Sequence, residues 1–137
     1  MGAWDSGPFD NDDAADFAGD LSQTGDAEDV AARLEGALTA VTGADGLVEA
    51  PVMNEALAAA AIVAVLTTPA LPTPASLDRS WIDAARSEPP VHLRGAAAQV
   101  FERALRPQDN EWYDLWAEAG LVEDVRVLVQ PYASALA

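Results

Sequence analysis

The chain has 137 residues, of which 23 are acidic and seven are basic, so its formal net charge is −16. All seven basic residues are arginine, and the sequence contains no cysteine. This composition excludes disulfides, a thiolate nucleophile and a zinc site built from cysteine. Binding to nucleic acid or to an anionic membrane needs clustered lysine or arginine, so neither is expected. A basic protein is the kind of partner that this charge would attract.

Half of the residues are apolar, and many of these are alanine, which favours closely packed helices. A chain of this length predicts one domain, covering residues 1–137. The opening sequence MGAWDSGPFDNDD has neither the basic stretch nor the apolar stretch of a secretory signal. We therefore expect a cytoplasmic protein.

The first eleven residues combine turn-forming residues with Trp4 and Phe9. This predicts an irregular segment that is anchored on the rest of the protein by its aromatic side chains. Asp12 is the expected N-cap of a first helix, which would end before Gly25.

Asp26 is expected to cap a second helix, with an apolar stripe that runs from Val30 to Val41. Gly43 would end this helix in the left-handed conformation. Pro51 suits the first turn of the helix that follows.

A central helix is expected over residues 52–67. From Ala56 to Leu66 it has no polar side chain on any face, so protein or lipid must cover it on all sides. At 1.5 Å per residue this run spans about 17 Å, whereas the core of a bilayer is about 30 Å thick. We therefore expect the other helices of the protein to surround it.

A proline-rich connection follows at residues 70–75, after which Ser76 would cap a fourth helix. A fifth helix is expected from Val91 to Leu105. Its apolar positions would face the core, and Arg94 would face outward.

Asp109 or Asn110 would cap a short sixth helix that Gly120 closes. The last helix would start near Val122, and Pro131 should kink it or split off its final turn. No segment alternates between apolar and polar residues for long enough to indicate a strand. The predicted fold is an all-α bundle of six to seven helices around the central one.

Two segments stand out by their sequence: GAWDSGPFDNDDAADFAGDL near the start and DNEWYDLWAEAG near the end. They resemble the two motifs of a bacterial family called domain of unknown function 4259. Asp5 departs from the first motif, where the family commonly has glycine, and Trp112 replaces a residue that is usually smaller. The resemblance implies a small helical protein and brings no established activity. The matching residues are Gly2, Trp4, Gly7, Phe9, Asn11, Asp12, Ala14, Asp16, Phe17, Leu21, Asp109, Asn110, Glu111, Leu115 and Trp116.

The densest polar cluster contains Asp10, Asp12, Asp13 and Asp16, whose carboxylates are ligands of the kind that calcium prefers. The spacing departs from the EF-hand pattern, because Ala14 occupies the third ligand position and no glycine occupies the sixth. The alternative, which we favour, is that these carboxylates cap the first helix and interact with its dipole.

No arrangement of residues indicates catalysis. His92 is the only histidine, and no serine lies in a nucleophile-elbow context. Pairs of carboxylates occur at many spacings in so acidic a chain, so they carry little information. We expect no cofactor and favour a non-catalytic protein.

Trp112 and Trp116 lie four residues apart on one helix face, with Asp109 and Asp114 nearby. If exposed, these four residues would form an aromatic and acidic patch suited to a basic protein surface. The alternative is that both tryptophans belong to the core.

The sequence therefore favours a protein that acts through protein–protein contact, as a regulatory module or a neutraliser of a basic toxin. The competing hypothesis is that it binds a small ligand or a divalent cation at the acidic cluster near the N-terminus.

Overall fold

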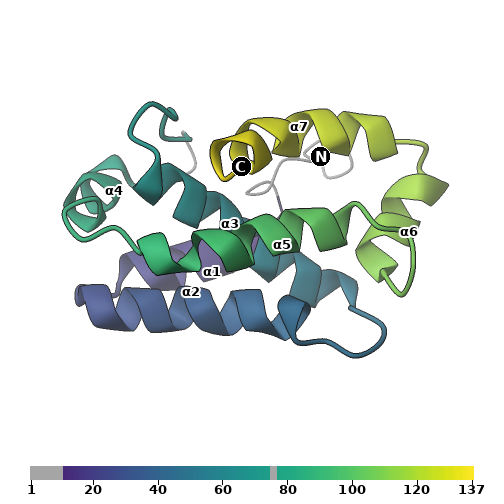
Figure 1. The fold of residues 1–137 in the computed structure, drawn as a ribbon, viewed down its shortest axis with the longest axis horizontal. Coiled ribbons are helices and arrows are strands. Elements are labelled where there is room, and N and C mark those ends of the chain that lie inside the picture. The colour runs from purple at the N-terminus through teal and green to yellow at the C-terminus, as the bar shows by residue number, and fades with distance from the viewer. Residues whose placement is uncertain (1–10, 75–76) are drawn as a thin grey trace.

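The computed structural model describes residues 11–74 and 77–137, and within these ranges the protein is all-α, as predicted (Figure 1). The only extended pairing there is a single parallel bridge between Val48 and Asn110. The predicted aromatic anchors Trp4 and Phe9 lie outside the described residues. The helices are α1 (Asp12–Ser22), α2 (Ala27–Thr42), α3 (Ala50–Thr67), α4 (Arg79–Ala85), the 3-10 turn η2 (Val91–Leu93), α5 (Arg94–Ala104), α6 (Glu111–Glu118) and α7 (Val122–Ala135).

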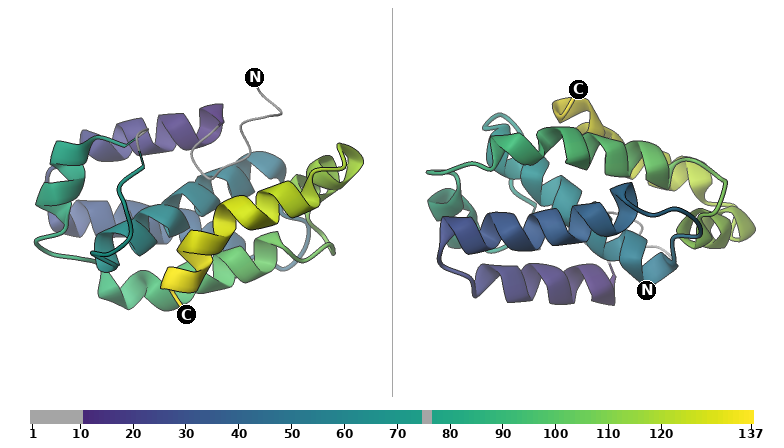
Figure 2. Two further views of the ribbon diagram at one scale, coloured as in Figure 1. Left: turned by 90° about the horizontal axis from the view of Figure 1, so that it is seen from above. Right: turned by 60° about the horizontal axis from the view of Figure 1, so that its bottom comes forward.

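Helix α3 lies at the centre of the protein, which confirms the predicted central helix. Thirteen of its 18 residues are buried, including every residue from Ala56 to Leu66. Helices α1, α2, α5, α6 and α7 all pack against it. Figure 2 shows α3 crossing the middle of the molecule, with α1 to one side and α5 and α7 to the other. By length and hydropathy α3 would qualify as a membrane span, but 72% of it is covered by protein.

The N-terminal ends of α1 and α2 are capped by side chains. The prediction for α1 was wrong by one residue: Asn11 is the N-cap, and its Oδ1 accepts a hydrogen bond from the Ala14 amide at 2.8 Å. Asp12 and Asp13 lie in the first turn, where the helix dipole favours negative charge. Asp26 caps α2 as predicted and accepts a hydrogen bond from the Glu28 amide at 3.2 Å.

Helix α2 ends at Thr42 as predicted, but Gly43 has a φ of −94° and is not left-handed. A Cβ atom at this position would lie 3.0 Å from the carbonyl oxygen of Thr39. Glycine is therefore favoured here by the close approach of a backbone carbonyl, and not by a left-handed conformation. Pro51 lies in the first turn of α3, as predicted.

Three later elements differ from their predictions. Asp78 caps α4 through the Trp81 amide, while Ser76, the predicted cap, lies outside the described residues. The predicted fifth helix begins as the η2 turn and becomes α-helical only at Arg94. Helix α7 continues through Pro131 to Ala135, so its final turn is not split off, and the alternative of a kink at Pro131 stays a prediction.

Candidate functional site

The acidic residues near the N-terminus do not come together in the described part of the chain. Asp12 and Asp16 are exposed, whereas the Asp13 carboxylate accepts a hydrogen bond at 3.1 Å from the Asn54 side chain of α3. Asp10 lies outside the described residues. Within residues 11–74 and 77–137, no three histidine or acidic side chains are grouped so that they would hold a metal ion. Asp13 therefore connects α1 to the central helix.

The predicted aromatic and acidic patch is wrong at Trp112, which is only 5% exposed and belongs to the core. Its ring meets that of the half-buried Trp116 edge to face, with the ring centroids 6.3 Å apart. Asp109 and Asp114 are exposed. The tryptophan pair therefore anchors α6 on the helices beneath it.

The second sequence motif forms a structural junction around Asn110, which is completely buried. Its Nδ2 donates hydrogen bonds to the carbonyl oxygens of Arg103, Ala104 and Arg106 at 3.1, 2.9 and 2.9 Å. Its Oδ1 accepts a hydrogen bond from the Tyr113 amide at 3.0 Å. The Asn110 side chain therefore pairs with backbone groups at the end of α5 and at the start of α6. The ends of helices have backbone groups that lack partners within the helix.

The same junction holds the start of α3. The Val48 amide donates to the Asp109 carbonyl at 2.9 Å, and the Glu111 amide donates to the Val48 carbonyl at 3.1 Å. The Glu111 carboxylate accepts a hydrogen bond from the Ala50 amide at 2.7 Å. Glu49, at the N-cap position of α3, makes no side-chain capping bond. A carboxylate from α6 therefore caps the central helix, at the end where its dipole favours negative charge.

Two arginines close the other end of α3. Arg86 donates to the Val65 carbonyl through Nε and Nη2, at 3.2 and 3.0 Å. Arg94 donates to Thr67 Oγ1 and to the Ala135 carbonyl, both at 2.6 Å. The prediction that Arg94 faces outward was wrong, because the carbonyls at the end of a helix need donors and favour a positive charge.

A third arginine is also engaged with the backbone: Arg103 donates to the Gln108 and Asp109 carbonyls at 2.9 and 2.7 Å. By contrast, every aspartate and glutamate in the described part of the chain is exposed, except Asp13. The one ion pair among these residues joins Arg126 to Glu123 at 3.2 Å. The arginines that stabilise the fold therefore do not neutralise the acidic surface.

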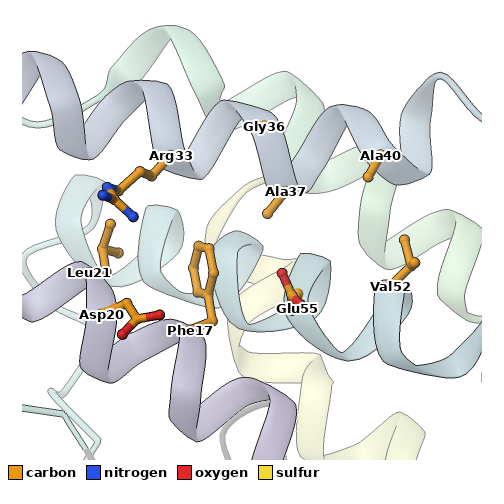
Figure 3. Close-up of a pocket in the computed structure, with 9 residues that line it drawn as sticks. All are labelled: Phe17, Asp20, Leu21, Arg33, Gly36, Ala37, Ala40, Val52 and Glu55. Atoms are coloured by element: carbon orange, nitrogen blue, oxygen red, sulfur yellow. The ribbon is translucent and has the colours of Figure 1, made fainter.

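A groove of about 380 Å³ lies where α1, α2 and α3 meet (Figure 3). Its apolar lining comes from the half-buried Phe17 and the buried Leu21 of α1 and from small or aliphatic residues of the other two helices. The charged groups beside it are Asp20, Arg33 and Glu55, all of them exposed. The groove is therefore open to solvent, apolar inside and charged at its edge.

A second hollow, of about 490 Å³, lies between α2 and residues 88–92, which include the start of η2. It is lined by Glu28, Glu35, Glu88 and the exposed His92, with alanine and proline between them. We call it the acidic cleft. No arginine lines it, so it adds to the negative potential of the surface.

These features define a small all-α protein with a buried, alanine-rich central helix and an acidic surface that is largely unpaired. The chain belongs to the family described as domain of unknown function (DUF4259), whose sequence model matches residues 2–126. The match includes both motifs and ends within α7, so it confirms the family that the motifs indicated. Neither the comparison with curated proteins nor that with solved structures found a match.

Proposed function

We propose that this protein is a non-catalytic module that binds a basic protein in the cytoplasm. The observation that supports the proposal is the separation of charge between the interior and the surface. Arg86, Arg94 and Arg103 donate to backbone carbonyls, while nearly all carboxylates of the described chain are exposed without a cationic partner.

A surface of this kind speeds the encounter with a positively charged partner and disfavours acidic ones. Neutralisation of a basic toxin, or regulation of a basic protein, is the role that such a module would serve. A gene for a small basic protein beside the gene for this one would identify the first partner to examine.

The test is affinity capture from a lysate of the source organism, followed by calorimetry with each purified basic protein that is captured. We expect one-to-one binding that weakens steeply as salt is raised, because screening reduces charge attraction. The test variant is E28Q/E35Q/E88Q, which removes the three carboxylates of the acidic cleft and should bind more weakly. Capture of no basic protein, or an affinity that does not change with salt, would contradict the proposal.

A further inference from the structure

We propose that the groove between α1, α2 and α3 holds one long basic side chain, a lysine or arginine, of the partner protein. Its aliphatic part would lie along the Phe17 ring, and its cation beside the Glu55 carboxylate. This inference rests on the proposed function and adds the place where the basic partner is anchored.

The size and lining of the groove suit such a side chain. Its volume of about 380 Å³ lies at the lower end of the range of ligand pockets, about 300–1,000 Å³. Phe17, Leu21, Ala37, Ala40 and Val52 give it an apolar interior. Lysine and arginine have an apolar stem and a charged head, so they bury the stem along such a surface and keep the head in water.

The charges around the groove favour a cation at one end. Figure 3 shows Arg33 pointing toward Leu21, with Glu55 on the other side of the Phe17 ring. A cation beside Glu55 would therefore lie away from Arg33. It would also lie close to the face of an aromatic ring, which attracts positive charge. An acidic side chain would gain neither contact.

Gly36 keeps the groove open. It lies inside α2, where glycine weakens a helix, and it is exposed. A Cβ atom at this position would meet nothing within 4 Å, so the packing of the fold does not require glycine. Because Gly36 lines the groove, a larger residue would occupy the space proposed for the partner.

The experiment measures binding of a hexalysine peptide at low salt by NMR titration of the ¹⁵N-labelled protein. We expect the largest shifts at Phe17, Ala37 and Glu55. Gly36→Leu and Glu55→Gln should each weaken binding by about tenfold, a change typical of an anchoring contact. Two matched controls should bind like the parent: Gly95→Leu, a helical glycine that also faces open space, and Glu118→Gln, an exposed carboxylate on α6.

The outcomes separate this inference from the proposed function. If the parent binds and all four variants bind equally, the acidic surface attracts the peptide without the groove, and only the inference fails. If the parent does not bind hexalysine, both fail. If Gly36→Leu changes the sedimentation of the protein alone, the groove holds a second copy of the chain and the inference is wrong. Thermal unfolding of each variant shows whether it is folded. The two leucine variants should remain helical, because leucine favours a helix over glycine.

Discussion

Asn110 shows how much a single side chain contributes to this fold. It is completely buried, and it pairs with the end of α5 through its amide nitrogen and with the start of α6 through its oxygen. Aspartate would supply only the acceptor, whereas asparagine supplies both groups. The asparagine of the second family motif is therefore explained by the hydrogen bonds that it makes within the fold.

Replacing Asn110 by alanine should lower the free energy of unfolding by about 2–4 kcal/mol, because it removes a cap and leaves buried carbonyls unpaired. Urea denaturation measures this loss. Gln108→Ala is the control: Gln108 is exposed and takes part in the junction only through its carbonyl, so its effect should stay within about 0.5 kcal/mol. Asn110→Asp keeps the cap but not the donors. If Asn110→Asp were as stable as the parent, the bonds to α5 would contribute nothing.

At this scale the sequence predicted local features better than distant ones. Asp26 caps α2, and Gly120 closes α6 with a φ of 74°, because each acts on residues close to it in the chain. For Arg94, helical spacing predicts a polar face and therefore an outward side chain, which is wrong. Its partners Thr67 and Ala135 lie 27 and 41 residues away, and no local pattern contains that information.

Among the elements, α3 determines the arrangement of the others. Its residues from Ala56 to Leu66 are at most 2% exposed, and six of these eleven residues are alanine. Small side chains on every face let several helices approach one backbone closely. This arrangement was predictable, because a run that is apolar on all faces has no other stable environment in a chain of this kind.

The close packing of helices around α3 leads to a prediction about the size of the side chains that α3 can accommodate. Ala60→Leu should destabilise the protein by about 1–3 kcal/mol, although leucine is a good helix former, because the added side chain has no space. Ala117→Leu makes the same change at an exposed position of α6 and should alter stability by no more than about 0.5 kcal/mol. Thermal unfolding of both variants tests this. Equal midpoints would mean that the helices around α3 are not closely packed.

At the scale of the whole molecule, the net charge of −16 produces repulsion mainly among carboxylates that have no cationic partner. The sign of this charge was evident from composition. The sequence does not show where the unpaired charge lies, because it does not show that Arg86, Arg94 and Arg103 bind carbonyls and not carboxylates. The groove beside Phe17 was likewise not predictable, because it joins residues of three helices whose packing no spacing reveals.

Mutual repulsion of these carboxylates should make the protein more stable as salt is added, because screening shortens the range of charge interactions. A gain of about 1 kcal/mol would raise the midpoint of thermal unfolding by about 4 °C in a protein of this size. The triple variant E28Q/E35Q/E88Q should show a smaller rise. A midpoint that does not respond to sodium chloride would contradict the prediction. A further rise with magnesium at the same ionic strength would instead favour cation binding at the acidic cluster.

The way α3 is closed at its ends has a consequence for the synthesis of the protein. Its first amide is capped by Glu111, and its last carbonyls accept hydrogen bonds from Arg86, at Val65, and from Arg94, at Thr67. All three residues leave the ribosome after α3 itself. While the chain is being synthesised, this helix is therefore an apolar segment whose terminal backbone groups lack their hydrogen-bond partners. It also has the hydropathy of a membrane span. Nascent chains that stop before Glu111 should bind chaperones or membrane-insertion factors, and release should follow once α6 has been made.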